Sequence, residues 1–289
     1  MSRNLALRIA VAAVAIPAIL WTCYQGGLWL LGMIALFALL AMVEFLWAEN
    51  WRPYHLLFWL SLVTVGTTLF FVYQGGAVAD QLDPTGWYAS VVGLMLPFFF
   101  VVTALYMAAG RQAPSALFSS HSRLVWGVSY IAFLYPLVFL VGEIGPGGGT
   151  DLPSGGDSLL YLFATLWIGD TAAMWVGSAF GKHKLAPTIS PKKTIEGFIG
   201  GLIGGLATGV LMMFWKFAGV PWYHVLLIAL GCSFFGQIGD LVESMWKRSL
   251  GIKDSSAIIP GHGGVLDRFD SLLFAAPFMY LYFRIFSLT

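Results

Sequence analysis

The stretch Leu28–Trp47, LWLLGMIALFALLAMVEFLW, decides the fold class of this chain. As an α-helix it would be about 30 Å long, which is the thickness of the hydrocarbon core of a bilayer. Its one ionisable side chain, Glu44, lies near the end of the run, where it can pair with Arg52 or reach the membrane interface. The sequence therefore predicts a transmembrane helix here.

Apolar runs of this length recur along the whole chain. Of its 289 residues 58% are hydrophobic and 10% are charged, so the polar surface is too small to cover a soluble globule. We expect an all-α polytopic integral membrane protein with about nine transmembrane helices. The predicted spans are Leu5–Tyr24, Leu28–Trp47, Leu56–Tyr73, Trp87–Ala109, Leu124–Val141, Leu159–Phe180, Ile195–Phe217, Trp222–Trp246 and Leu266–Phe286.

The composition also excludes several classes of site. The formal net charge of +1 argues against a nucleic-acid partner. Cys23 and Cys232 are the only cysteines, and both lie in apolar runs, which excludes a disulfide framework and a cysteine-based zinc site. Neither a Walker A motif nor a dinucleotide-binding glycine fingerprint occurs.

Lysine and arginine are distributed asymmetrically between the predicted loops. With a cytoplasmic N-terminus and an outer C-terminus, all of the 15 Lys and Arg residues except Lys216 and Arg284 fall on the cytoplasmic side. Positive residues are retained on that side of a membrane. We expect this orientation in a bacterial-type cytoplasmic (inner) membrane.

The chain divides into two parts by the kind of polar residue it carries. Residues 1–141 form an expected transmembrane scaffold. Residues 142–289 form an expected catalytic region, with cytoplasmic loops at 181–194 and 247–266. In this second part Asp170 lies near the middle of a predicted span, where an ionised carboxylate needs a polar cavity, a cation or a partner. A buried hydrogen bond to a neighbouring helix is the structural alternative.

The first of these loops carries lysines that suit a phosphate. Ser190-Pro191-Lys192-Lys193-Thr194 precedes a predicted helix, which Ser190 or Thr194 can cap. A capped helix start beside lysines binds anions, so we expect phosphate contacts from Ser190, Lys192 and Lys193. The alternative is that the lysines only determine topology.

Glycine repeats every four residues along the next span. Gly197, Gly201, Gly205 and Gly209, together with Gly200 and Gly204, form a ridge that allows another helix to approach closely. The partner can be a helix of the same chain or of a second subunit, so a homodimer is one expectation.

Acidic side chains mark the ends of the last two spans. Asp240 lies about 9 Å inside the cytoplasmic end of its span and has no cation one helical turn away. Glu243 and Lys247 are spaced for a plain salt bridge. Asp267 and Asp270 share one face at the start of the last helix, so three carboxylates could converge at the cytoplasmic end of the bundle.

The stretch Ser244–Asp270, SMWKRSLGIKDSSAIIPGHGGVLDRFD, concentrates charge in an otherwise apolar chain. Its glycines flank His262 and allow backbone N–H groups to approach an anion. Its cations suit a polyphosphate or a phospholipid head group. The alternative is a solvated basic loop. Expected phosphate-binding groups in the stretch are Lys247, Arg248, Lys253, His262, Gly263, Gly264 and Arg268.

Hard oxygen ligands of this kind suit Mg²⁺, which retains waters and bridges phosphates. Phosphoryl and nucleotidyl transfer chiefly require positioning and neutralisation of charge. From the residues alone we expect a membrane-embedded, metal-dependent enzyme that handles phosphates at the cytoplasmic face.

The order of these motifs resembles the phosphatidate cytidylyltransferase family, also called CDP-diacylglycerol synthases. The resemblance is strongest from Asp170 to Asp270. It rests on Asp170-Thr171-Ala172-Ala173, with Ala172 where the family has Gly, on Ser190–Gly197, and on Lys247-Arg248, His262-Gly263-Gly264 and Asp267-Arg268 with Asp270.

This resemblance implies transfer of CMP from CTP to phosphatidic acid. Asp240 and Asp267 would hold Mg²⁺, with Asp270 and Asp170 as further ligands or supporting groups, and a second cation is compatible with the site. Asp240, Asp267, Lys193 and Arg268 are the expected catalytic residues.

Two other functions remain open at this point. An enzyme that consumes CDP-diacylglycerol would need a differently spaced Asp-rich motif, which the sequence lacks. A cation- or proton-coupled transporter would use Asp170, Asp240 and Glu243 as a relay, with polar groups on both sides of the midplane.

Overall fold

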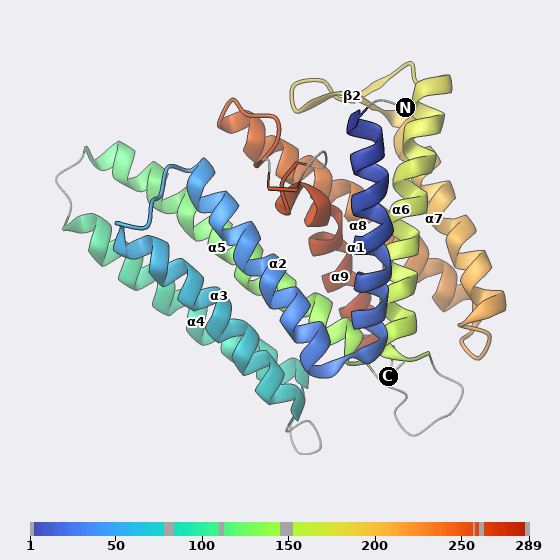
Figure 1. The fold of residues 1–289 in the computed structure, drawn as a ribbon, viewed down its shortest axis with the longest axis horizontal. Helices are drawn as coiled ribbons and strands as arrows, with labels where there is room; N and C mark the ends of the chain where they lie inside the picture. The colour runs from blue at the N-terminus through green and yellow to red at the C-terminus, as the bar shows by residue number, and fades with distance from the viewer. Residues whose placement is uncertain are drawn as a thin grey trace. The chain divides into compact units, whose positions relative to one another are not determined.

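Nine helices and two short strands make up the described part of the chain (Figure 1). The computed structural model describes residues 3–77, 84–109, 113–144, 153–256, 258–259 and 263–286. The helices are α1 (Arg3–Gln25), α2 (Gly27–Ala48), α3 (Leu56–Ala77), α4 (Pro84–Ala108), α5 (Pro114–Gly142), α6 (Gly155–Phe180), α7 (Ile195–Trp215), α8 (Trp222–Ser249) and α9 (Leu266–Ile285), and the strands are β1 (Lys184–Ala186) and β2 (Ser190–Thr194).

The chain is an all-α polytopic membrane protein, as the apolar runs predict. Helices form at all nine expected positions, and in the described residues seven of them, α2 to α8, are long and apolar enough to cross a bilayer. The apolar part of α1, Val11–Gln25, is shorter. Helix α9 carries Asp267, Arg268, Asp270 and Arg284 along its 20 residues.

The helices pack as two compact units. Unit 1 contains residues 1–30 and 137–289, and unit 2 contains residues 31–136. The expected division at residue 141 places α1 with the scaffold, whereas α1 packs with the C-terminal helices in unit 1. In unit 2, Arg123 Nε donates to Glu49 Oε2 at 2.7 Å, and Thr103 Oγ1 lies 2.7 Å from His121 Nε2. These contacts join the residue that follows α2 to α5, and α4 to α5.

Helix α7 lies between α6 and α8 in unit 1, and its glycines make this packing possible. A Cβ on Gly204 would lie 2.6 Å from the Cβ of Ala172 on α6, and a Cβ on Gly205 would lie 2.6 Å from the Cβ of Ser233 on α8. No side chain fits at these positions without a shift of a helix. The glycine ridge therefore serves helices of the same chain, and the expectation of a homodimer loses its support from this ridge.

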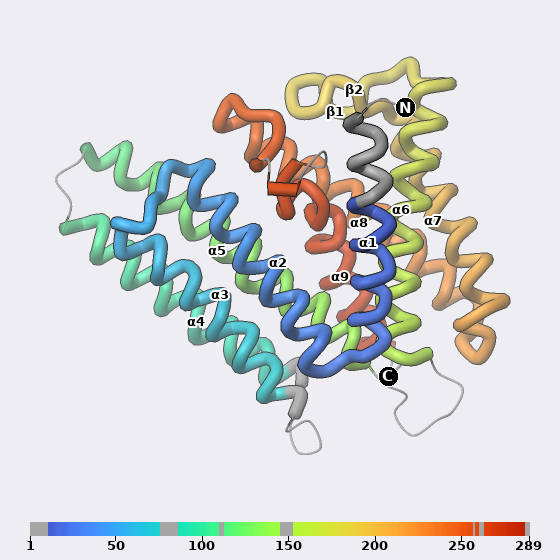
Figure 2. Tube along the Cα trace, in the orientation of Figure 1, coloured from blue at the N-terminus to red at the C-terminus, as the bar shows by residue number. Residues whose placement is uncertain are grey.

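A two-stranded antiparallel hairpin joins α6 to α7 (Figure 2). The sequence predicts a loop at 181–194, and within it the structure pairs Lys184 with Thr194 and Ala186 with Ser190. Thr194 ends the second strand and caps α7, because its Oγ1 accepts from Gly197 N at 3.1 Å. Of the two caps that the sequence allows, the structure selects Thr194.

The other end of unit 1 is held by a cluster around Asp157, which we call the clasp. Lys216 Nζ lies 3.0 Å from Asp157 Oδ1, and Tyr24 Oη donates to the same oxygen at 3.1 Å. Asp157 also completes the capping box of α6 with Ser154. The clasp therefore connects α1, the start of α6 and the end of α7.

Replacing Lys216 with Ala should leave turnover nearly unchanged, because the clasp lies far from the lysines of the hairpin along α7. It should lower the midpoint of thermal unfolding by about 1–3 °C, since a partly exposed ion pair contributes at most about 1 kcal/mol. Thermal unfolding in detergent measures this shift. Asp157→Asn should have a similar or larger effect, and the two changes together should be less than additive. Full additivity would show that the pair contributes nothing.

Candidate active site

A pocket of about 480 Å³ opens in unit 1 beside the hairpin. Helices α6, α7 and α8 and both strands contribute to its wall. The lining residues are Asp170, Ala173, Met174, Gly177, Ser178, Leu185, Lys192, Lys193, Thr194, Gly197, Phe198, Gln237 and Asp240. The pocket thus brings together Asp170, Lys192, Lys193 and Asp240, four of the residues that the sequence analysis selects.

The lysines reach the pocket because the base of the hairpin is anchored to α7. Glu196, in the first turn of α7, accepts from the backbone N–H groups of Lys182 at 3.1 Å and His183 at 3.2 Å. His183 Nδ1 lies 2.7 Å from Glu196 Oε1. A carboxylate at a helix N-terminus is also favoured by the helix dipole. These contacts direct the second strand, with Lys192 and Lys193, along the mouth of the pocket.

An ion pair crosses the pocket from the hairpin to α8. Lys193 Nζ lies 2.7 Å from Asp240 Oδ2. The other carboxylate oxygen, Oδ1, accepts from Ser244 Oγ at 3.3 Å, one turn further along α8. Asp240 therefore has the cation that its own helix does not provide.

Asp170 faces the same pocket from α6. Its charge interacts with those of Asp240 and Lys193. The carboxylate in the middle of a predicted span thus has a polar cavity and a nearby cation, which are the conditions that make such a charge tolerable at membrane depth.

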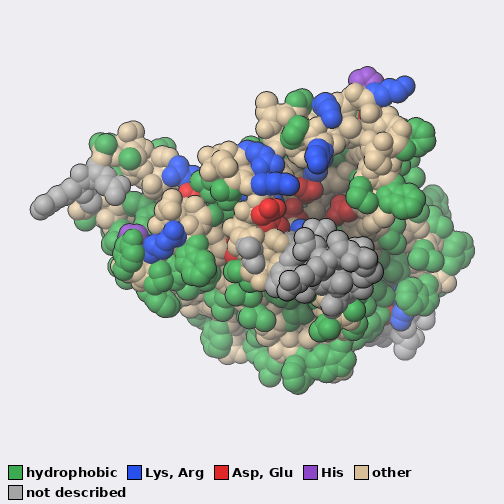
Figure 3. Space-filling view, turned by 45° about the horizontal axis from the view of Figure 1, so that its top comes forward, with side chains coloured by type: hydrophobic (Ala, Val, Ile, Leu, Met, Phe, Trp, Pro, Cys, Tyr) green, Lys and Arg blue, Asp and Glu red, His purple; other side chains and the backbone are tan. Residues whose placement is uncertain are grey.

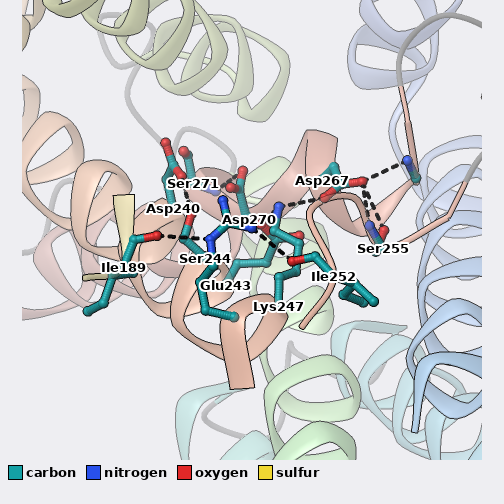
Figure 4. A network of polar contacts seen from close by, with 12 residues as sticks. Ile189, Asp240, Glu243, Ser244, Lys247, Ile252, Ser255, Asp267, Asp270 and Ser271 are labelled. Carbon is teal, nitrogen blue, oxygen red and sulfur yellow. Dashed lines mark hydrogen bonds and ion pairs between the residues drawn. The ribbon is translucent and has the colours of Figure 1, made fainter. Parts of the chain in front are cut away.

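A second polar cluster, centred on Lys247, lies where α8 meets α9 (Figure 4). Lys247 Nζ forms ion pairs with Glu243 on its own helix and, at 2.6 Å, with Asp267 Oδ1 on α9. Its side chain is 11% exposed and that of Glu243 is fully buried. The sequence predicts a phosphate contact for Lys247, whereas the structure encloses it between two carboxylates.

Asp267 also organises the glycine-containing segment that precedes α9. Its Oδ2 accepts from Ser255 N at 2.9 Å, from Ser255 Oγ at 3.0 Å and from Gly264 N at 2.8 Å. Gly263 adopts φ +84°, and a Cβ there would lie 3.0 Å from Asp267 Oδ2. Only glycine fits both demands without strain. The Gly264 N–H, expected to face an anion, here faces the carboxylate of Asp267.

Asp270 links the Lys247 cluster to the pocket. It is 9% exposed, and its Oδ1 accepts from the backbone N–H of Ser271 at 2.7 Å. Its charge interacts with those of Asp240 and Asp170, and also with that of Glu243. Carboxylates from α6, α8 and α9 therefore converge in one region of unit 1, as the spacing of Asp240, Asp267 and Asp270 suggests.

The remaining predicted cations in the described residues are Arg248, Lys253 and Arg268. Figure 3 shows acidic side chains gathered beneath Lys and Arg side chains on this face of the molecule. Arg248 Nε donates to the carbonyl of Ile189 in the turn of the hairpin at 3.2 Å, and Arg248 Nη1 donates to the carbonyl of Ile252 at 2.8 Å. Lys253 and Arg268 are exposed, and Ser190 is half-buried. His262 lies outside the described residues.

The residues of the pocket fit a magnesium ion that arrives with a phosphate ligand. In the part of the chain that the structure describes, no group of three or more His, Cys, Asp or Glu side chains forms a ready metal cage. Mg²⁺ does not need one, because it commonly binds one or two carboxylates and completes its shell with waters and substrate phosphates. Asp170 and Asp240 provide carboxylates of this kind beside two lysines.

Gln237 lines the pocket although the sequence analysis does not select it. Its amide nitrogen donates to the carbonyl of Phe198 on α7 at 3.2 Å. A Cβ on Gly201 would lie 2.9 Å from the same nitrogen, so the glycine ridge also makes room for this amide. The spacing of three residues from Asp240 places both on one face of α8 and could have indicated it.

Comparison with known proteins agrees with this arrangement of motifs. The model of the cytidylyltransferase family matches residues 6–286, nearly the whole chain. The chain belongs to the cytidylyltransferase family. The resemblance noted from Asp170 to Asp270 is thereby confirmed at the level of the family.

Named relatives of this family match a shorter stretch. The phosphatidate cytidylyltransferase of Staphylococcus haemolyticus is 52% identical over 121 residues, which are 42% of this chain and 46% of the relative. That of Bacillus subtilis is 47% identical over 129 residues, 45% of this chain and 48% of the relative. The matched stretch thus spans about half the length of these curated relatives.

Proposed function

We propose that this protein transfers CMP from CTP to phosphatidic acid, giving CDP-diacylglycerol and pyrophosphate. One observation carries the proposal: a single pocket presents two carboxylates and two lysines in a chain about 50% identical, over the matched stretch, to phosphatidate cytidylyltransferases. Carboxylates beside lysines are what a metal-bound triphosphate requires. The active site would lie at the cytoplasmic face of a bacterial inner membrane.

The proposed reaction needs no general base. A phosphate oxygen of phosphatidic acid, already anionic at neutral pH, forms a bond to the α-phosphorus of CTP. The bond from that phosphorus to the oxygen bridging to the β-phosphorus breaks, and pyrophosphate leaves with the electron pair. Lys192, Lys193 and the exposed Arg268 would bind and orient the negatively charged phosphates. Further phosphate contacts are proposed for Ser190, Arg248, Lys253, His262 and Gly263. Lys247 and Gly264 are not among them, because both donate to Asp267.

Mg²⁺ is the proposed cofactor, and a second cation is compatible with the site. When bound, it would neutralise the triphosphate charge and polarise the α-phosphorus. Asp240 and Asp267 are the proposed ligands, with Asp170 and Asp270 as further ligands or supporting groups. Because Asp267 already accepts from Lys247, Ser255 and Gly264, its proposed metal role requires one of these contacts to open.

The proposed sidedness follows from the lysines of the hairpin. Lys182, Lys184, Lys192 and Lys193 lie in one interhelical segment, and such segments remain on the cytoplasmic side. The proposed orientation therefore has the N-terminus inside and the pocket at the cytoplasmic face. The alternative of a coupled transporter has no support from the named relatives.

Release of pyrophosphate from CTP by the purified protein tests the proposed function. We expect release that requires added phosphatidic acid and Mg²⁺, with CDP-diacylglycerol formed in equal amount. A neutral diacylglycerol in place of phosphatidic acid is the matched control, because it lacks the attacking phosphate. Pyrophosphate release that is equal with and without phosphatidic acid would contradict the proposal. So would the absence of release with any lipid.

A further inference from the structure

Lys193 and Asp240 form an ion pair inside the pocket. Each also has a proposed role there, Lys193 in binding phosphate and Asp240 in holding the metal. Their charged atoms are 2.7 Å apart, and their side chains are 26% and 36% exposed. The two residues are 47 positions apart in the sequence and belong to different elements, β2 and α8. The contact is therefore a product of the fold.

The proposed roles of these residues conflict with the ion pair. A metal ion on Asp240 Oδ2 would occupy the place of the Lys193 ammonium, and two cations so close together repel each other. A lysine held by a carboxylate cannot at the same time neutralise a phosphate at full strength. The paired arrangement and the loaded arrangement must therefore alternate.

We propose that Lys193 and the metal ion exchange at Asp240, which couples loading of the metal to binding of the nucleotide. This inference rests on the proposed function. Without nucleotide, the ammonium group of Lys193 neutralises Asp240. When the metal–nucleotide complex enters, the metal replaces the ammonium group, and Lys193 turns to the triphosphate.

The surroundings of the pair suit such an exchange. Lysine is a point charge on a flexible stem, so it can change partners within a few ångströms. Asp240 keeps a contact with Ser244 through its other oxygen, at 3.3 Å, and so stays oriented when the lysine leaves. Asp170 lines the same pocket and interacts with both members of the pair, so its charge is available to either cation.

Lys192 provides the matched comparison for Lys193. Both lysines line the pocket from β2, yet of these two only Lys193 forms an ion pair with a carboxylate of the described residues. Lys184, on β1, is exposed and does not line the pocket. Substitution of each by Met removes the same charge from the same hairpin.

Titration of the nucleotide-free protein in detergent with Mn²⁺, followed by electron paramagnetic resonance, tests the exchange. In Lys193→Met, the affinity for Mn²⁺ should rise about threefold to tenfold, because the competing ammonium group is gone. Affinity for CTP in the presence of Mn²⁺ and absence of lipid should fall about tenfold or more, because a charged phosphate contact is lost. The two affinities move in opposite directions.

The controls separate this pairing from a general effect of charge. Lys192→Met should weaken CTP binding with a smaller gain in Mn²⁺ affinity, and Lys184→Met should change neither by more than about twofold. In an Asp240→Asn background, the gain from Lys193→Met should disappear, which a double-mutant cycle measures.

Equal Mn²⁺ affinities in the wild type and Lys193→Met, or no detectable Mn²⁺ binding by either, would overturn the exchange. So would a gain as large in Lys192→Met as in Lys193→Met. Failure of the proposed function is seen separately, because a wild-type protein that releases no pyrophosphate with phosphatidic acid contradicts the reaction whatever the titration shows.

Discussion

Replacing Asp267 with Asn is expected to abolish CTP-dependent turnover of phosphatidic acid in a protein that still folds and inserts into the membrane. Each carboxylate oxygen of Asp267 accepts from donors, Lys247 on one side and Ser255 with Gly264 on the other. In Asp267→Asn the NH₂ group replaces one of these acceptor oxygens, so a hydrogen-bond donor would face the donors on that side. The substitution also removes the negative charge that is proposed to hold Mg²⁺. Turnover should fall at least about a hundredfold to a thousandfold.

Pyrophosphate release measures this loss, and gel filtration with circular dichroism in detergent tests folding. Lys216→Ala, at the opposite end of α7, is the control that should retain turnover. Near-normal activity of Asp267→Asn would refute the metal assignment. An aggregated variant would show instead that the contacts to Ser255 and Gly264 are needed for folding, which contradicts the expected folded product.

Replacing Lys247 with Met is expected to destabilise the protein more than any other change considered for this chain. Glu243 is fully buried, and in the described part of the chain it is held by the ion pair with Lys247 and by a contact with Asp267. Removal of the lysine leaves this charge and that of Asp267, 4% exposed, with less compensation. Loss of one partner of a buried pair costs about 3–5 kcal/mol, so the yield of folded protein and its unfolding midpoint should both fall sharply.

A second substitution shows whether the buried charge is the cause. Lys247→Met combined with Glu243→Gln should recover a large part of the lost stability, because no uncompensated carboxylate remains at position 243. Lys253→Met removes an exposed lysine a few residues away and should leave the unfolding midpoint nearly unchanged. If Lys247→Met is as stable as Lys253→Met, the buried ion pairs do not hold α8 against α9.

The helices could be predicted because their signal is local. A run of about 20 apolar residues must form its backbone hydrogen bonds internally in a bilayer, and every described helix except α5 begins within four residues of its predicted start. Helix α5 begins ten residues before its expected start at Leu124, at Pro114, because its first turns are polar and give no apolar signal. The hairpin also gave no clear signal in the sequence, because its strands are only three and five residues long.

The candidate site could be predicted as a set of residues, but its partners could not. The motifs select Asp170, Lys193, Asp240 and Asp267 from composition and spacing. That Lys193 pairs with Asp240 and Lys247 with Asp267 depends on how β2 and α9 pack on α8. The contacts of Gln237 could not be predicted, because its bond to Phe198 and the room left by Gly201 depend on how α7 packs on α8.

The amino-acid sequence alone determined that the chain is a helical membrane protein and which polar residues stand out from its apolar runs. Both follow from the cost of placing charge and unpaired backbone groups in hydrocarbon, which each segment meets by itself. Only the tertiary structure decided that the glycine ridge faces α6 and α8, that Lys247 lies between two carboxylates, and that Lys193 forms an ion pair with Asp240. These features arise where separate helices meet, because the distance between two charges is set by packing and has no counterpart in their spacing along the chain.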